Sequence, residues 1–247
     1  MNRVTAIAFS LVLFCLLAII ARPYWGQPAA KKPKPKGRPV IETPERMVPL
    51  KLDLPKPMVL GTPFPINEPN VSKERVKGQP RPVVRVPMGS VNLALKKPVT
   101  TNEPLAFAGE PDMVTDGDKS GEDGHEVNIG FGKKWVQIDL GAKSTIYAIA
   151  IWHYHNEIEP RAYRDVIVEV ANDGDFEKTT IIYNNDHDNS YGRGAGTAKG
   201  WIERSEGKVL AFPKGVVARY VRLHSRGNSQ NDQNHYVEVE VYGLTGI

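Results

Sequence analysis

The segment from Trp152 to Glu157 combines two aromatic rings, two imidazoles, an amide and a carboxylate, and two arginines, Arg161 and Arg164, follow soon after. Recognition of a sugar needs a flat apolar surface for the C–H face of the ring and fixed polar groups for its hydroxyls. The segment offers both kinds of group. Its residue types are therefore typical of a binding site for a polyhydroxylated ligand.

Alternation along an extended strand places Trp152 in the core and leaves its neighbours for the ligand. The segment begins at the end of an expected strand and runs into a loop, where β proteins usually place their sites. The candidate ligand residues here are His153 or His155, Asn156, and Arg161 or Arg164.

Two further loops are expected to join this site. Residues 184–193 are polar and contribute Asn185, and residues 225–234 are dense in amide side chains. Tyr191 or Trp201 would supply the plane on which a sugar ring stacks.

A metal-dependent hydrolase is a less favoured alternative. The pair His153 and His155 lies on one face of a strand, and imidazoles with carboxylates can hold zinc and activate water. The sequence has none of the motifs H-E-x-x-H, G-x-S-x-G or G-x-x-x-x-G-K-[ST] that would assign a base, a nucleophile or a phosphate cradle. Its single cysteine, Cys15, lies in the N-terminal apolar run, so the remainder has no thiol. We therefore expect a binding protein and not an enzyme.

Strands must position the candidate ligand residues, because residues 91–247 consist of short runs of β-branched and aromatic residues that turn residues separate. The sequence pattern VIVEV at 166–170 and VEVEV at 237–241 predicts strands with one buried and one wet face. The expected strands are residues 135–140, 146–152, 165–171, 179–183, 218–224 and 236–242.

Helical periodicity is not sustained for three turns anywhere beyond residue 91, so a βαβ architecture is excluded. The pattern predicts an all-β fold, an antiparallel β-sandwich over residues 91–247 with functional loops at its ends.

The first 90 residues have a different composition. They hold 15 of the 20 prolines and 15 Lys or Arg against 5 Asp or Glu, whereas the rest holds 17 against 23. Prolines at this density break helices and sheets. We expect residues 22–90 to be a disordered, extended Pro/Lys-rich linker. Because the basic charge lies in that linker, it does not predict nucleic-acid binding.

Residues 4–21 carry no charge and follow Arg3, which predicts export. Residues 1–21 form an apolar helix that is either a cleaved signal peptide or a retained anchor, since their length fits both. The chain is then secreted or held on the extracytoplasmic side of a membrane, which it touches only through this segment. The basic cluster from Lys31 to Arg38 could contact an anionic surface.

Five short motifs follow one another across residues 91–247: NLALKKPV at 92–99, TDGD at 115–118, WVQIDLG at 135–141, RYVRL at 219–223 and EVEVYG at 238–243. In these motifs the sequence resembles the discoidin family, also called coagulation factor V/VIII type C domains, and the related family 32 carbohydrate-binding modules. The resemblance implies a jelly-roll-like, galactose-binding-domain-like sandwich that binds rather than catalyses. Members with sugar ligands commonly use a His and an Arg from the region of residues 153–164. The chain lacks the cysteine pair of the coagulation-type domains, which indicates a bacterial member.

The acidic turn Asp116-Gly117-Asp118 presents oxygens toward one point, as a hard cation requires. The resemblance implies a structural Ca²⁺ held by the side chains of Asp116 and Glu238. Its companions would be the carbonyl oxygens of Met113, Asp118 and Val237. Gly121 stands where the family often has a hydroxyl ligand.

The sequence thus predicts a calcium-stabilised, non-catalytic, extracytoplasmic module that binds a cell-surface or environmental glycan. The alternative is a structural or adhesive component of the cell envelope that binds another envelope protein.

Overall fold

The computed structural model describes residues 46–57, 66–72, 80–156 and 159–246. The chain divides into two units, Met1–Ile41 and Glu42–Ile247, and the described residues belong to the second. The expected helix of residues 1–21 and the basic cluster from Lys31 to Arg38 lie outside the described residues. Within the ranges that are described, no helix has both the length and the apolar character to span a bilayer.

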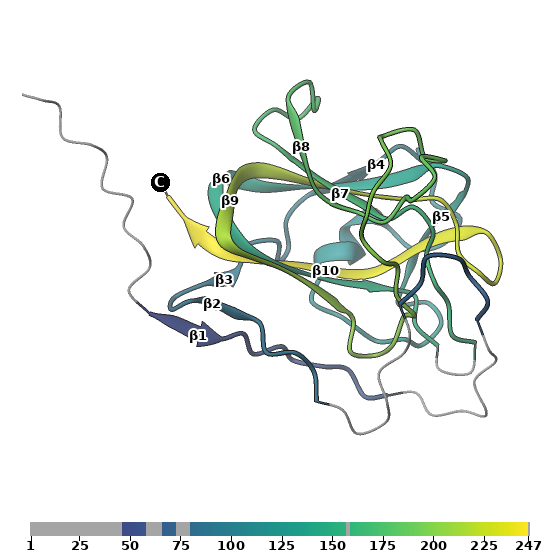
Figure 1. Cartoon of the computed structure of the whole chain (residues 1–247), viewed down its shortest axis with the longest axis horizontal. Coiled ribbons are helices and arrows are strands. Elements are labelled where there is room, and N and C mark those ends of the chain that lie inside the picture. The colour runs from purple at the N-terminus through teal and green to yellow at the C-terminus, as the bar shows by residue number, and fades with distance from the viewer. Residues whose placement is uncertain (1–45, 58–65, 73–79, 157–158, 247) are drawn as a thin grey trace, which may run out of the picture. The chain divides into compact units, whose positions relative to one another are not determined.

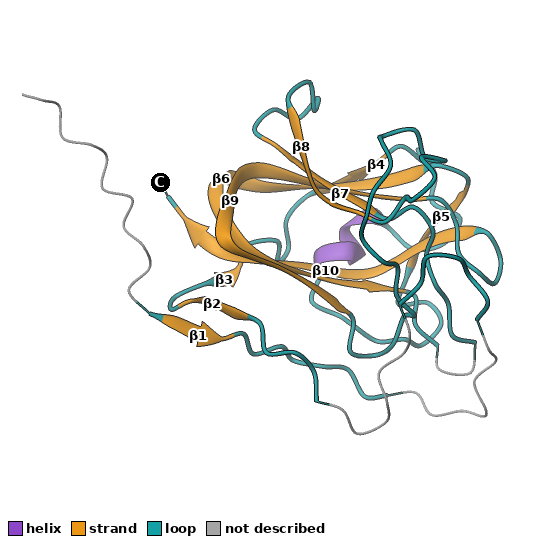
Figure 2. Ribbon diagram, in the orientation of Figure 1, coloured by secondary structure: helices purple, strands orange, loops and turns teal. Residues whose placement is uncertain are grey.

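Nearly all regular structure in the described residues is β-strand, and the one short 3-10 helix among them lies between the two layers of strands (Figure 2). The predicted all-β fold is confirmed. The elements are β1 (Met47–Pro49), β2 (Arg85–Pro87), β3 (Val91–Asn92), β4 (Val99–Thr101), η1 (Pro111–Thr115), β5 (Val127–Phe131), β6 (Lys134–His153), β7 (Ile167–Ala171), β8 (Thr179–Asn184), β9 (Lys208–Ser225) and β10 (Gln233–Thr245).

The eight strands from β3 to β10 form one antiparallel sheet that folds over on itself into a sandwich. The order is β3-β10-β6-β9-β7-β8, with β4 added to β6 and β5 added to β10. The first part of β6 pairs with β4, its last part pairs with β10, and β9 follows β6 along both parts. Figure 1 shows the two layers, with β7 and β8 above and β3 and β10 below. The predicted antiparallel sandwich is confirmed.

An irregularity in β6 allows this strand to serve both layers. The register with β9 shifts between Asp139 and Ser144. Gly141 lies in this stretch with φ +83°, a conformation that only glycine adopts without strain. Its N–H donates to Asp139 Oδ1 at 2.8 Å. Because bulges bend strands, the chain passes from one layer to the other here without leaving the sheet.

The core between the layers consists of inward-facing aliphatic residues from both. Ile138, Ile149, Val168, Leu223 and Val239 are all fully buried. Burial of each such side chain stabilises the fold by about 1.5–3 kcal/mol.

The outer face of the lower layer is also covered, and this corrects the predicted wet face. Glu238 on β10 is fully buried, and in the upper layer Glu169 on β7 is fully buried too. On β6 the outward Ala148 and Trp152 are fully buried as well. Two apolar clusters on this side contain four residues from the N-terminal segments: Leu50, Leu52, Val84 and Val86.

Part of the expected linker of residues 22–90 is therefore folded onto the sandwich. Strands β1 and β2 pair antiparallel, with Met47 opposite Pro87, and the compact unit begins at Glu42 instead of residue 91. The prolines fit because Pro49 and Pro87 stand at strand ends, where a missing N–H breaks few ladder bonds. Valine and leucine between the prolines supply the apolar contacts.

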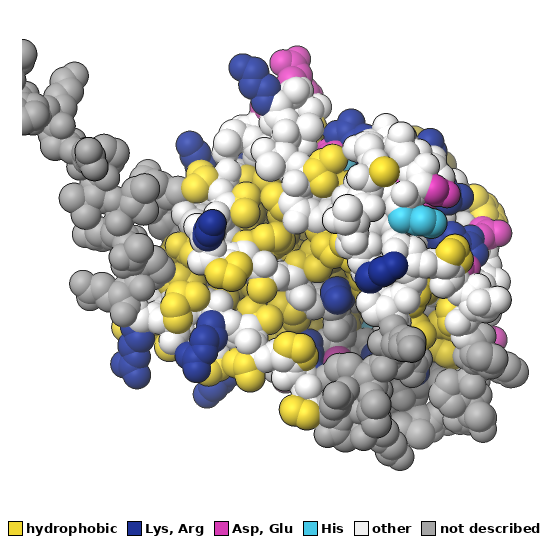
Figure 3. All heavy atoms as spheres, in the orientation of Figure 1, with side chains coloured by type: hydrophobic (Ala, Val, Ile, Leu, Met, Phe, Trp, Pro, Cys, Tyr) yellow, Lys and Arg dark blue, Asp and Glu magenta, His cyan; other side chains and the backbone are white. Residues whose placement is uncertain are grey.

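The C-terminal end of β10 lies beside these segments. Leu244 packs in the same cluster as Val86 and Leu50. Figure 1 places β1, β2 and the C-terminus at one end of the unit, away from β5. Figure 3 shows hydrophobic side chains still in view on this face, with lysine and arginine side chains among them.

Candidate functional site

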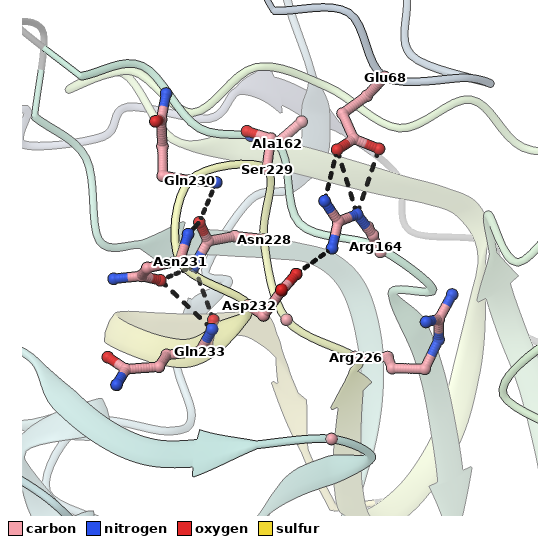
Figure 4. A network of polar contacts seen from close by, with 12 residues as sticks. Glu68, Ala162, Arg164, Arg226, Asn228, Ser229, Gln230, Asn231, Asp232 and Gln233 are labelled. Carbon is pink, nitrogen blue, oxygen red and sulfur yellow. Dashed lines mark hydrogen bonds and ion pairs between the residues drawn. The ribbon is translucent and has the colours of Figure 1, made fainter.

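The loop between β9 and β10 lies at the far end of the sandwich from the C-terminus and is held rigid by its own amide groups (Figure 4). Asn228 is fully buried; its Nδ2 donates to Asn231 Oδ1 and to the Gln233 carbonyl, both at 2.7 Å. Its Oδ1 accepts from the Gln230 N–H at 2.8 Å. Short amide side chains favour turns because they bond to nearby backbone groups. Much of the predicted amide cluster therefore builds the loop, and Gln230, Asn231 and Asp232 remain exposed.

A second segment, residues 160–164, runs alongside this loop. The Arg226 N–H donates to the Arg164 carbonyl at 2.9 Å, and the Arg164 N–H donates to the Gly227 carbonyl at 3.0 Å. Ser229 N–H donates to the Ala162 carbonyl at 3.0 Å. These bonds place two guanidinium groups, from Arg164 and Arg226, at the same end of the sandwich (Figure 4).

Arg164 is bound by carboxylates on two sides. Its Nε and Nη2 donate to Glu68 at 2.6–3.2 Å, and its Nη1 donates to Asp232. The hydrogen bonds that Arg164 donates to Glu68, with the one that it donates to Asp232, raise the pKa of Arg164 further above its usual range. The side chain of Arg164 remains 30% exposed, so the group still reaches the surface.

Arg226 is held by a fixed acid. Its Nε donates to Asp165 Oδ2, and its Nη2 donates to Ser190 Oγ at 2.9 Å. Asp165 is buried and has φ +54°, a left-handed conformation that a non-glycine residue keeps only when its surroundings enforce it. The Arg226–Asp165 pair is therefore part of the framework of this end.

A cavity of about 300 Å³ lies between residues 68–71 and the loops of the sandwich. Its lining is Glu68, Pro69, Asn70, Val71, Ala162, Tyr163, Arg164, Asp165, Asn185, His187, Asp188, Gly200 and Arg226. Two of the predicted ligand residues, Arg164 and Asn185, thus border one hollow.

Three acidic side chains also come together in the part of the chain that is described: Asp165, Asp186 and Asp188 have oxygens within 4.8 Å of one another. Asp186 accepts hydrogen bonds from the Ser190 and Tyr191 N–H groups, each at 2.9 Å. These contacts hold the loop closed and use both oxygens of Asp186.

The two predicted histidines lie in the interior, 0% and 1% exposed. His153 stacks on Tyr163 with ring centroids 4.2 Å apart, and its Nδ1 lies 2.5 Å from Glu203 Oε1. His155 Nε2 lies 3.0 Å from the Lys119 carbonyl. Both imidazoles are buried because the end of β6 is covered on both faces. This burial does not fit the contact with a ligand that the sequence predicted. The two imidazoles also bond to different partners, so the geometry does not support a shared zinc site.

Three of the other six predicted ligand residues are interior too. Arg161 is 7% exposed and lies over the Tyr154 ring, with its guanidinium carbon 4.4 Å from the ring centroid. Asn185 is 5% exposed and accepts from the Val166 N–H at 2.7 Å. Trp201 is 9% exposed.

Asn156 and Tyr191 are half-buried. Asn156 Nδ2 donates to Tyr154 Oη at 3.4 Å. Tyr191 Oη donates to the Lys134 carbonyl at 3.2 Å, and burial raises the pKa of Tyr191 to about 12. Of the predicted set, Arg164 is therefore the residue whose charged group best combines exposure with convergence on the cavity.

Sequence reasoning missed an exposed aromatic pair. Phe107 and Phe131 are 59% and 55% exposed, and their rings meet edge-to-face with centroids 6.0 Å apart. Phe131 lies opposite Gln233 in the pairing of β5 with β10, so the pair borders the β9–β10 loop. The signal was the sequence Gly130-Phe131-Gly132, which sets an aromatic residue between two turn-forming glycines.

A second buried feature is the carboxylate of Glu169 on β7, which is fully buried. Its two oxygens accept from Arg193 Nε and Nη2 at 2.6 Å, and His224 Nε2 lies 3.4 Å away. Burial raises the pKa of Glu169, but the hydrogen bonds from His224 and Arg193 outweigh burial and lower it to about 2.

The residues expected to hold calcium fit a cation in part. Glu238 is fully buried; its Oε2 accepts from the Gly117 N–H at 3.1 Å, and its Oε1 has no hydrogen-bond partner among the described residues. Burial raises the pKa of Glu238 to about 9. A buried carboxylate oxygen without a donor is costly, and a hard cation would satisfy it.

The carbonyl oxygens expected to complete the calcium site differ in how well their surroundings suit a bound cation. Val237 lies at a register shift between Tyr236 and Glu238, where a bulged residue leaves the ladder. The Met113 carbonyl accepts a long bond from the Asp116 N–H, at 3.4 Å. The side chain of Asp118 is not available, because its Oδ2 lies 2.7 Å from His125 Nδ1. The carbonyl oxygen of Asp118 is then the group left for the cation, and it is also the group that the resemblance implies.

Comparison with known proteins agrees with this architecture. The family model for the F5/8 type C domain matches residues 98–239, more than half of the 247 residues. No curated protein matches the chain.

Several solved structures have a similar fold. Chitosan-binding module 1 of a chitosanase/glucanase from Paenibacillus sp. IK-5 has 21% identity over 62% of this chain and 99% of that chain, with a TM-score of 0.45. A fucose-binding module of Streptococcus pneumoniae, SpX-3, has 19% identity over 63% and 99%, with a TM-score of 0.44. The CBM32 of AlyQ in complex with 4,5-unsaturated mannuronic acid has 19% identity over 58% and 92%, with a TM-score of 0.42.

The family match spans three of the five motifs that suggested the resemblance wholly and the other two in part, and it coincides with the sandwich from β4 to the middle of β10. The chain belongs to the F5/8 type C domain family, also called the discoidin family.

Proposed function

We propose that this chain is a non-catalytic binding protein that recognises carbohydrate through residues 160–165 and 226–233. The observation that carries the proposal is the convergence of fixed charged and amide groups at Arg164 and the β9–β10 loop, which the exposed rings of Phe107 and Phe131 also border. Hydroxyl-rich ligands need such groups held in place together with an apolar surface. The resemblance of the motifs to the discoidin family supports the proposal, since its members usually bind rather than catalyse.

A glycan array probed with the full chain tests this function. Arg164→Gln removes the exposed guanidinium and should weaken binding to the glycans recognised by at least about tenfold, because hydrogen bonds to charged groups contribute about 1.5–3 kcal/mol. Arg219→Gln is the matched control, because Arg219 also makes a two-oxygen ion pair, with Asp139, away from the loop end. Equal binding by the two variants would contradict the proposed site.

We also propose a structural Ca²⁺ at Asp116 and Glu238, completed by the carbonyls of Met113, Asp118 and Val237. The unpartnered Glu238 oxygen supports it. At free Ca²⁺ of 100 times the dissociation constant the gain is about 2.7 kcal/mol, or about 5–10 °C in melting temperature. Chelation should remove this gain from the native chain and have no effect on Glu238→Gln. A melting temperature that chelation leaves unchanged would refute the assignment.

Export remains a proposal. The uncharged residues 4–21 and the basic cluster from Lys31 to Arg38 support a chain that is secreted or anchored on the extracytoplasmic side, with a possible anionic contact. N-terminal sequencing of the chain recovered by cell fractionation separates a cleaved signal from an anchor. Recovery of the intact chain only in the cytoplasm would contradict both.

A second candidate function is docking to an envelope protein. It is favoured by three large apolar side chains that are exposed near one end, since Leu105 is 80% exposed beside Phe107 and Phe131. A silent glycan array, together with co-purification that Phe107→Ser abolishes, would support this function over carbohydrate binding.

A further inference from the structure

Residues 66–72, which we call the strap, lie across the loop end and form one wall of the 300 Å³ cavity. Val71 makes a parallel bridge with Gly200. The Gly200 N–H donates to the Asn70 carbonyl at 2.9 Å, and the Ser72 N–H donates to the Gly200 carbonyl at 2.8 Å. The strap is therefore docked in a defined register against residues 198–200.

Asn70 fixes that register. Its Nδ2 donates to the carbonyls of Asn185 and Ala198 at 2.8 and 3.1 Å, and its Oδ1 accepts from Lys199 Nζ at 2.9 Å. Its φ of +62° turns the chain at this point. Anchoring at Asn70 delivers Glu68, two residues earlier, to Arg164.

The contact between Glu68 and Arg164 has the geometry of a bound carboxylate ligand. Both oxygens of Glu68 face the Nε and Nη2 edge of the guanidinium, at 2.6–3.2 Å, and the Glu68 side chain is only 13% exposed. Arginine favours this two-point arrangement with carboxylates from any source. In Figure 4 Glu68 approaches Arg164 from the opposite side to Asp232.

Of the two guanidinium groups at this end, only Arg164 has an acid partner that is separate from the sandwich. Arg226 is paired with Asp165, which is 6% exposed and belongs to the framework of the loops. Glu68 comes from a segment 96 residues away in sequence. Displacement of the strap would therefore free the Nε and Nη2 edge of Arg164, while Arg226 would stay occupied.

We propose that Glu68 is an internal stand-in for the carboxylate of an acidic saccharide, and that such a ligand binds by displacing Glu68 from Arg164. The inference rests on the proposed carbohydrate-binding function and names its ligand class, a sugar chain that contains hexuronic acid. A neutral hydroxyl in the place of Glu68 would leave the guanidinium without its two-point anionic partner, whereas a uronate carboxylate restores it.

The strap then acts as a competitor within the same chain. The apparent affinity for an acidic ligand equals the intrinsic affinity multiplied by the fraction of molecules in which Glu68 has left Arg164. Removing the charge of Glu68 should raise affinity for acidic ligands, while affinity for neutral ligands should not change. The two classes of ligand therefore separate this inference from general sugar binding.

Calorimetric titration of the full chain tests the inference with two probes, tetragalacturonate and its carboxyl-reduced neutral form. Glu68→Gln should bind the acidic probe about threefold to tenfold more tightly than the native chain, with no change for the neutral probe. Glu177→Gln, which removes an exposed charge in the turn before β8, is the matched control and should change neither affinity. Arg164→Lys keeps the charge but loses the two-point geometry, and should weaken acidic binding about tenfold.

A second variant distinguishes release of the strap from a local folding effect of the substitution at Glu68. Asn70→Gly keeps the backbone conformation but removes the anchoring amide, so it should also raise affinity for the acidic probe. If Glu68→Gln and Asn70→Gly leave acidic affinity unchanged, or raise both affinities equally, the inference is wrong while sugar binding stands. If no glycan binds the native chain or its variants, the proposed function fails, and the inference fails with it.

Discussion

Replacing Val86 with alanine should lower the free energy of unfolding by about 1–2.5 kcal/mol. Val86 lies on β2, is 3% exposed and packs with Tyr147 and Ala148 of β6. The substitution removes two carbon atoms from a buried site, each worth about 0.8 kcal/mol of transfer free energy. Incomplete closure of the cavity would add to this loss, and a compact unfolded state would reduce it.

Urea unfolding followed by tryptophan fluorescence measures this loss, since Trp152 is fully buried in the adjoining cluster. Val83→Ala is the matched control, because Val83 lies on the same segment and is 71% exposed. It should change the free energy of unfolding by less than about 0.5 kcal/mol. For a unit of this size, Val86→Ala should also lower the melting temperature by about 2–10 °C.

Equal and small effects of the two substitutions would refute the packing of residues 80–90 on the sandwich. The proline-rich segment would then be the extended linker that composition suggests. Removal of residues 1–90 should be more damaging than Val86→Ala, because Leu50, Leu52 and Val84 would be lost from the same outer face.

Two other predictions concern the interior. Arg193→Gln should lower stability most near pH 7 and progressively less as the pH falls below 4.5, because it removes one of the two basic partners, Arg193 and His224, of a Glu169 carboxylate whose pKa is about 2 in the native fold. Urea unfolding at pH 7 and pH 3 measures the difference, and a loss of stability that does not vary with pH would contradict it. Gly207→Ala should destabilise the chain by about 1–3 kcal/mol more than Gly194→Ala. Both glycines have positive φ, but only at Gly207 would a Cβ lie 2.5 Å from the Trp152 ring. Thermal unfolding of the pair checks this, and equal losses would refute it.

The sandwich was predictable because its signals are local. Alternation at Val166, Val168 and Val170 marks a strand whatever surrounds it, and the family motifs add their order along the chain. The predicted wet face failed because the residues that cover it come from far away in sequence. One signal was present: residues 146–152 are an unbroken run of apolar residues, which is typical of a strand covered on both faces.

The candidate site was predictable only in outline. Residues 225–234 and Arg164 were within reach of sequence reasoning, because both belong to connections between strands at one end of the sandwich. His153 was misassigned since a strand end usually turns outward, and nothing local shows that Tyr163 and Trp201 cover it. Glu68 was not foreseen, since its partner lies 96 residues further along the chain.

The proximity of Leu244 to Leu50 and Val86 has a consequence for how the protein presents itself. The chain enters and leaves the described unit at neighbouring points, whereas the β9–β10 loop lies at the other end of β10, a strand of 13 residues and about 40 Å. The first and last described residues therefore lie at the end of the unit opposite to the β9–β10 loop. Arg164 and Phe131 are separated from both of these points by about the length of that strand, so a label attached at either point would stay clear of the proposed site.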